Sequence, residues 1–261
     1  MTWFEEWYFV LERIWGRATQ RYCDSKRVFQ KSPRTLRRVY DAKIKLIMNA
    51  RALWPTYVTT EEDEQLRNER WNIYYKNKRV VMWDNTNIKL HKPSNSEAQR
   101  NTFSTYYNDN VGKGSVFIQL CGWMGTYELW CGGVSDSDYM IRSGVLEQQK
   151  LFVLNDRTNN NIPFLNILDR GYRIISAAWR TGGQFVLQPA FAKSDQKFNT
   201  LDVIRSAAVA SDRGGNERAV RIAKMCGSLK NGLHSNGSAD RLCDLWLVWS
   251  FQSNFMFKKV L

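Results

Sequence analysis

The stretch F-L-N-I-L-D at residues 164–169 is a nearly continuous apolar run that ends in an acid. Such a run is typical of a central strand that is buried on both faces of a sheet. Upstream, V-V-M-W-D at residues 80–84 has the same character and also ends in an Asp. We therefore expect two central strands, each with a carboxylate at the point where the strand ends.

The segments around these two runs predict a mixed α/β fold. Further strands are expected at residues 115–123 and 126–134, and residues 172–178 and 184–191 are expected to form another strand or a hairpin. Helices are expected at 34–53, 137–149 and 201–222. Met124-Gly125 favours a tight hairpin turn between the strands expected at 115–123 and 126–134. The polar segment 89–114 predicts a loop. Because the strands come first and then alternate with helices, we expect a mixed sheet flanked by helices.

The first part of the chain differs from the rest in composition. Residues 1–75 have few strand signals and many helix formers, so we expect a basic, mainly helical N-terminal region ahead of an α/β domain at 76–261. The helix expected at 34–53 carries many cations, which form either a solvated basic face or a DNA-contacting surface. These cations are Arg37, Arg38, Lys43, Lys45 and Arg51.

The overall charge favours a polyanionic partner. Lys and Arg number 38 against 25 acidic residues, which gives a net charge of +13 and a pI near 9.6. Such an excess attracts nucleic acid, because each neutralised phosphate releases counterions. A ribosome-associated or membrane-surface protein would show the same excess.

Several kinds of site are disfavoured by the sequence. The five Cys are scattered without a C-x-x-C pair and only two His are present, so a structural zinc site is not expected. No G-x-x-x-x-G-K-[ST] loop occurs, so no nucleotide cofactor is implied. The acidic N-terminus lacks a secretion signal and no apolar run has membrane-spanning length. We expect an intracellular protein that is not secreted, in the nucleus of a eukaryote or otherwise in the cytoplasm or nucleoid.

A third acid completes a candidate metal site. Glu217 lies in R-G-G-N-E-R-A-V, in the stretch with helical character. Carboxylates from two strand ends and a facing helix, here Asp84, Asp169 and Glu217, are suited to holding divalent ions against a phosphodiester. The cations expected to contact the DNA backbone are Arg170, Arg213, Arg218, Arg221 and Lys224.

The order of these motifs resembles a known family. The sequence is similar to the catalytic domain of the DDE superfamily of transposases and endonucleases. The similarity lies in three motifs in order: D-x-T-x-I, then L-D-R-G-Y, then R-x-x-x-E-R-x-x-x-x-x-K. A further similar segment, G-V-S-D-S-D-Y at 133–139, lies between the first two. Within that superfamily it most resembles the PIF/Harbinger-type branch, over residues 76–230. The resemblance implies an RNase H-like fold in which Asp84, Asp169 and Glu217 bind two Mg²⁺ or Mn²⁺ ions. It also implies DNA cleavage, attack of the freed 3′-hydroxyl on target DNA, and a homo-oligomer on DNA ends.

Some positions depart from that pattern or leave alternatives open. Asn216 stands before Glu217 where relatives usually have an aliphatic residue, and Asp202 and Asp212 are rivals for the third acid. Asp136 and Asp138 are expected to cap a helix rather than to support the metal site. A domesticated, catalytically silent relative that binds DNA or a protein partner is the alternative function.

Overall fold

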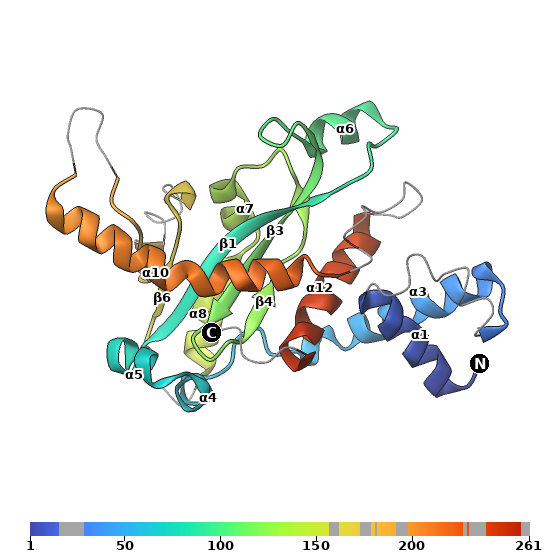
Figure 1. The fold of residues 1–261 in the computed structure, drawn as a ribbon, viewed down its shortest axis with the longest axis horizontal. Coiled ribbons are helices and arrows are strands. Elements are labelled where there is room, and N and C mark those ends of the chain that lie inside the picture. Colours follow the sequence, from blue (N-terminus) through green and yellow to red (C-terminus); the bar gives the residue numbers. More distant parts are fainter. Residues whose placement is uncertain are drawn as a thin grey trace.

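The computed structural model describes residues 1–15, 29–156, 162–172, 179–180, 182–191, 198–226, 229 and 239–256. Over these residues the protein is a mixed α/β fold in which a curled sheet is flanked by helices (Figure 1). This architecture is consistent with the RNase H-like fold expected from the sequence.

Two long strands form the centre of the sheet. β1 (Arg79–Lys89) pairs antiparallel with β3 (Asp109–Gln119) on one side and parallel with β6 (Phe164–Ile167) on the other. The strand order is β2-β3-β1-β6-β7, with β4 and β5 paired to β3. The remaining strands are β2 (Phe103–Ser104), β4 (Met124–Thr126), β5 (Trp130–Cys131) and β7 (Phe185–Leu187).

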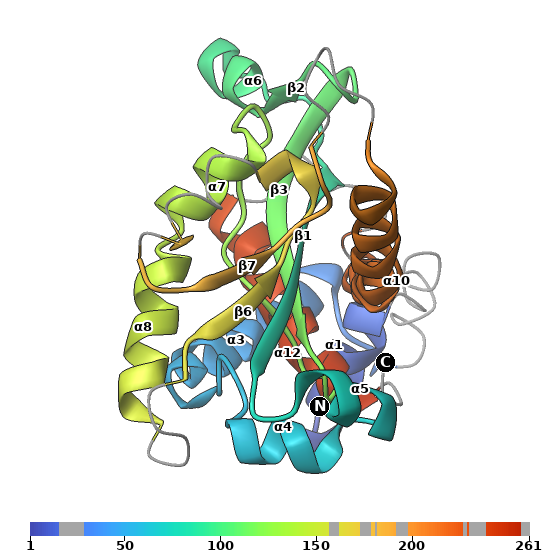
Figure 2. The same cartoon turned by 90° about the vertical axis from the view of Figure 1, so that its left-hand side faces the viewer.

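The alternation of side chains along β1 divides the interior into two apolar clusters. Val80 and Met82 belong to a cluster with residues of α10 (Thr200–Ala223) and α12 (Ala239–Met256). Val81 and Trp83 belong to a second cluster with residues of α7 (Asp136–Arg142) and α8 (Val145–Asn155). Since successive side chains of a strand point to opposite faces, β1 forms a wall shared by both clusters. Figure 2 shows the two helix layers on opposite sides of the sheet.

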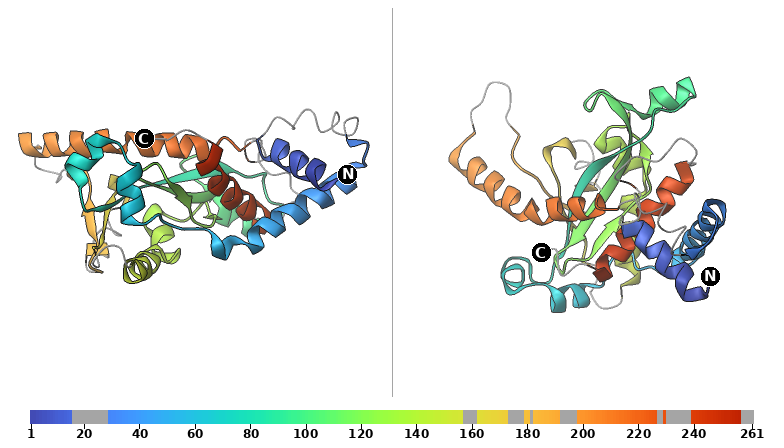
Figure 3. Two further views of the ribbon diagram at one scale, coloured as in Figure 1. Left: turned by 90° about the horizontal axis from the view of Figure 1, so that it is seen from below. Right: turned by 45° about the vertical axis from the view of Figure 1, so that its right-hand side comes forward.

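The N-terminal helices extend the first of these clusters. Apolar residues of α1 (Trp3–Trp15) and α3 (Pro33–Asn49) are buried together with residues of α12. Figure 3 shows these two helices side by side at the end of the molecule where α12 lies. The other elements are η1 (Arg51–Leu53), α4 (Thr60–Leu66), α5 (Glu69–Tyr75), α6 (Ser96–Thr102) and η2 (Arg170–Tyr172).

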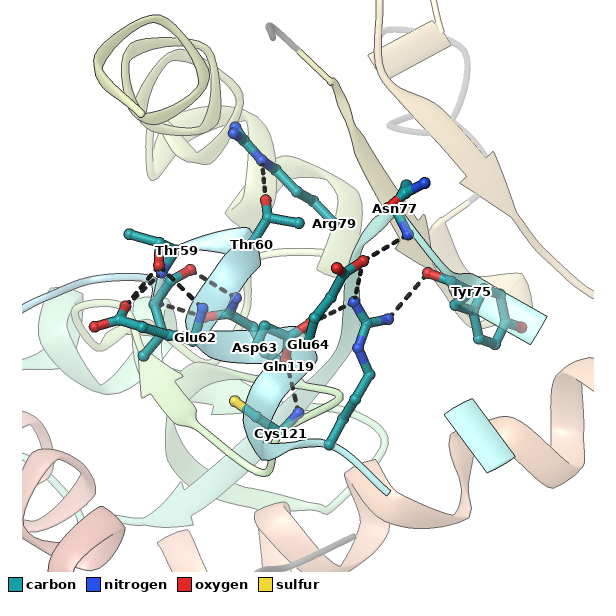
Figure 4. A network of polar contacts seen from close by, with 12 residues as sticks. Thr59, Thr60, Glu62, Asp63, Glu64, Tyr75, Asn77, Arg79, Gln119 and Cys121 are labelled. Carbon is teal, nitrogen blue, oxygen red and sulfur yellow. Dashed lines mark hydrogen bonds and ion pairs between the residues drawn. The ribbon is translucent and has the colours of Figure 1, made fainter. Parts of the chain in front are cut away.

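A buried polar network holds α4 and α8 against the sheet (Figure 4). The Asp63 carboxylate accepts a hydrogen bond from the backbone N–H of Cys121 at 2.7 Å. Arg79, at the start of β1, donates to the Thr60 hydroxyl at 2.7 Å and pairs with the carboxylate of Asp156 at 2.6 Å. Both side chains of the Arg79–Asp156 pair are 2% exposed. Because charges this deep need partners, the network fixes how the helices meet the sheet.

Two local predictions are wrong. The segment 89–114 is not simply a loop, since β1 runs to Lys89, β3 begins at Asp109, and α6 and β2 lie between them. The start of β3 was missed because its V-G-K-G-S sequence has little strand propensity. Gly114 is nevertheless required there, since an added Cβ would lie 2.8 Å from atoms of Leu129 and Trp246.

The hairpin turn after β3 also lies elsewhere. Met124 and Gly125 are inside β4, and the turn is made at Gln119–Trp123, where Gly122 has a φ of +92°. Most of the strand expected at 172–178 lies outside the described residues. No described helix has both the length and the apolar character needed to cross a membrane.

Candidate active site

Asp84 lies within β1, and Asp169 lies two residues after the end of the adjacent strand β6. The strand end expected at Asp84 is therefore wrong, because β1 continues through Asp84 to Lys89 and stays paired with β3. Met82 of β1 is paired with Ile167 of β6, and Asp84 and Asp169 each follow two residues later. Because side chains two residues apart share a face, both carboxylates are on the side of the sheet that α10 covers. Sequence and register thus bring together the first two acids of the candidate triad.

The surroundings of Asp84 disfavour its charge. Burial, together with the negative charges of Asp169 and Asp136, raises the pKa of Asp84 to about 6. The positive charge of Arg213 has the opposite effect. An aspartate with a raised pKa beside two other acids is typical of a site that receives a positively charged or phosphate-bound partner.

Arg213 provides the neutralising charge at this end of the sheet. It lies on α10, and its guanidinium is 3.3 Å from a carboxylate oxygen of Asp169. The sequence predicted a DNA contact for this arginine, whereas in the structure it contacts the acid itself. No short sequence motif signals this pairing, because the two residues are far apart in the chain.

Among the described residues, several buried polar atoms without a hydrogen-bond partner lie on the segments that carry this site. Buried polar atoms in folded proteins are nearly always satisfied, so each of these atoms is open to a contact with solvent or a bound group. The unsatisfied atoms are Asn85 Oδ1, Asn87 Oδ1, the Tyr172 hydroxyl, Arg213 Nε, and both polar side-chain atoms of Asn216.

The third acid does not join the first two. Glu217 is exposed on α10, one helical turn beyond Arg213, whereas its neighbour Asn216 is 1% exposed and faces the interior. The rival Asp212 accepts a hydrogen bond from the hydroxyl of Tyr75 at 2.7 Å, which directs it toward α5. The other rival, Asp202, lies in the first turn of α10.

The fit of this site to a divalent metal is therefore partial. The two aspartates supply the oxygen ligands that Mg²⁺ and Mn²⁺ prefer. However, no three His, Cys, Asp or Glu side chains among the described residues form a group that would hold an ion. Arg213, rather than Glu217, is the side chain of α10 that contacts Asp169.

The other predicted DNA contacts lie at the surface near this site. Arg170 is exposed directly after Asp169, with its guanidinium 5.5 Å from the centre of the Phe198 ring. Arg218 and Arg221 are exposed on the C-terminal half of α10, and its C-cap residue Lys224 is exposed as well.

The acids between the first two motifs have separate roles. Asp138 belongs to the helix cap, because Ser135 is the N-cap of α7 and its hydroxyl both accepts from the Asp138 N–H and contacts the Asp138 carboxylate. Asp136 instead forms an ion pair with Lys113 of β3 at 2.8 Å. The cap prediction is therefore right for Asp138 and wrong for Asp136, and Lys113 is a residue of this region that sequence reasoning did not single out.

Comparison with known families adds one finding. The sequence model of a family described as DDE superfamily endonuclease matches residues 83–250 of the 261. The match includes Asp84, Asp169 and Glu217. No curated protein and no solved structure matches the chain.

Proposed function

Because the chain belongs to the DDE superfamily of endonucleases, we propose that it is a metal-dependent DNA endonuclease and transposase of the PIF/Harbinger type. The observation that carries this proposal is the pair of carboxylates within the matched segment, Asp84 inside β1 and Asp169 just after the adjacent strand β6. The net charge of +13 supports DNA as the substrate.

In this proposal Asp84, Asp169 and Glu217 hold two Mg²⁺ or Mn²⁺ ions. When bound, such ions supply Lewis-acid stabilisation of charge at the phosphodiester and a more acidic water or hydroxyl. Glu217 has to turn inward to complete the set, and Arg213 screens the two aspartates until it does. Arg170, Arg218, Arg221 and Lys224 then position the DNA backbone.

The finer parts of the proposal follow the family resemblance. The nicked strand ends with a 3′-hydroxyl that attacks target DNA, so that the protein both cleaves and joins. A homo-oligomer would hold the two DNA ends, and a eukaryotic source would place the protein in the nucleus.

A catalytically silent relative is the second candidate. It is favoured by one specific observation: Arg213 contacts Asp169 and Glu217 is exposed, so the described side chains do not form a three-acid group. Such a protein would bind DNA through its basic surface, or bind a protein partner, without cutting DNA.

The test is plasmid cleavage with purified protein in Mg²⁺ or Mn²⁺. We expect the wild type to nick supercoiled DNA and Asp84→Asn, Asp169→Asn and Glu217→Gln each to reduce nicking to background. Asp212→Asn is the matched control, because it makes the same charge change on α10 at a carboxylate that faces Tyr75.

The outcomes separate the candidates. Nicking that survives all three triad changes would sink the assignment of the active site. Loss of nicking in Asp212→Asn but not in Glu217→Gln would transfer the third role to Asp212. DNA binding without cleavage in either metal would establish the silent relative.

A further inference from the structure

Lys113 and Asp136 form an ion pair that is set into the wall of the candidate site. Lys113 is 8% exposed, and its ammonium donates to the backbone carbonyl of Val134 and to the carboxylate of Asp136 at 2.8 Å. A buried ammonium is costly unless it is paired and hydrogen-bonded. Lys113 therefore holds the Asp136 carboxylate, which is 40% exposed, while Ser135 and Asp138 form the helix cap.

The first turn of α7, which begins with Asp136, contacts the segment that follows the first acid. The side-chain amide of Asn85, the residue after Asp84, donates to the backbone carbonyl of Asp136 at 3.4 Å. The contact is long, but it comes from β1 itself. It links the middle of β1, next to Asp84, to α7.

The same turn contacts the segment that follows the second acid. The Ser137 hydroxyl donates to the carbonyl of Gly171 at 3.3 Å. A Cβ placed on Gly171 would lie 3.4 Å from a carboxylate oxygen of Asp136, so this carboxylate rests against the backbone two residues after Asp169. The charge of Asp136 also reaches Asp84 and Tyr172 and raises the pKa of each, in both cases in addition to the effect of burial.

We propose that Asp136, held by the buried Lys113, is a positioning residue that fixes the segments after Asp84 and Asp169 relative to each other. This inference rests on the proposed function, since the two aspartates must keep their separation to act on one phosphodiester. Removal of the Asp136 charge releases Lys113 and loosens both segments, while the DNA-contacting cations are unchanged.

The first measurement is hydrogen exchange, which is independent of catalysis. In Asp136→Asn we expect amide exchange of residues 84–88 and 169–172 to be faster by about tenfold or more, with little change elsewhere. Asp138→Asn is the matched control, because it removes the same charge from the same helical turn without touching Lys113. Exchange that is unchanged in both segments, or equally faster in the control, overturns the proposal whether or not the protein cuts DNA.

The second measurement is single-turnover cleavage together with the DNA dissociation constant. Asp136→Asn should slow cleavage by about 10–100-fold, the usual effect of residues that orient metal ligands, with DNA affinity changed less than about twofold. Lys113→Met should have a similar effect, and the double variant should be no slower than the slower single variant. Unchanged cleavage, or losses that simply multiply, overturns the proposal. If the wild type does not cleave, the proposed function fails and the exchange data alone decide the role of Asp136.

Discussion

Replacement of Asp84 by Asn should make the protein more stable at neutral pH while it removes activity. The carboxyl group is destabilising when ionised, because burial and the charges of the neighbouring acids raise its pKa from 3.8 to about 6. One pKa unit corresponds to about 1.4 kcal/mol, so the ionised group costs the folded state at most about 3 kcal/mol. The Asn amide needs hydrogen-bond partners of its own, which takes back about 1 kcal/mol.

The sign of this effect depends on pH. Because the pKa is higher in the folded state, the contribution of Asp84 is fully present below pH 3.8 and is lost as the pH rises through 6. The variant should therefore gain about 2 kcal/mol in unfolding free energy at pH 8 and close to nothing at about pH 4.5. The assay is urea unfolding in EDTA at both pH values, so that bound metal does not contribute.

Asp109→Asn is the control, because the fold lowers the pKa of this carboxyl instead of raising it. The ammonium of Lys89 holds the pKa of the Asp109 carboxyl below its usual range, so its ionised form is favoured by the fold. This variant should not be stabilised at pH 8. If Asp84→Asn is destabilised at pH 8, or if its gain is the same at both pH values, the reasoning about the charge of Asp84 is wrong.

Two further predictions concern the frame of the site. Arg79→Met leaves the buried carboxylate of Asp156 without its partner and should lower the free energy of unfolding in urea by about 3–5 kcal/mol. Lys89→Met breaks an exposed ion pair and should lower it by less than about 1 kcal/mol. Equal losses in the two variants would contradict the burial argument. Gly125→Ala forces a Cβ into the ring of Phe117 and should lower the free energy of unfolding, measured by calorimetry, by about 1–3 kcal/mol. The control Gly214→Ala in α10 places its Cβ in open space and should raise the free energy of unfolding by up to about 1 kcal/mol. A neutral Gly125→Ala would show that this ring moves freely.

The sequence predicted the parts of the site that depend on local pattern. Apolar runs that end in Asp84 and Asp169 marked the two central strands, although β1 continues beyond Asp84 to Lys89. The helix expected at 201–222 is observed as α10 at Thr200–Ala223. These elements are visible because burial imposes an apolar composition on a central strand and a long run of helix formers on a flanking helix.

The orientation of α10 could not be predicted in the same way. Adjacent residues on a helix point about 100° apart, so it matters greatly whether Asn216 or Glu217 faces the sheet. Alanines occur on several sides of this helix, and its apolar pattern does not select one face sharply. The burial of Asn216 therefore depends on tertiary packing.

Long-range charge pairing was the other missed feature. Lys113 lies between two glycines in a stretch with weak strand propensity, and its partner Asp136 stands in a sequence that reads as a helix cap. Only the pairing of β3 with its neighbours brings the two together. Residue type and spacing alone give no sign of such a contact.

The shared wall formed by β1 has a consequence for how this protein can evolve. Substitutions in the strand affect one cluster at a time, since even-numbered residues such as Met82 and odd-numbered residues such as Trp83 belong to different clusters. An insertion or deletion of one residue would exchange the two sets and turn Asp84 toward α7 and α8. We therefore expect β1 to tolerate substitutions but not changes of length, and length changes between β1 and β3 to be tolerated in the segment that joins them.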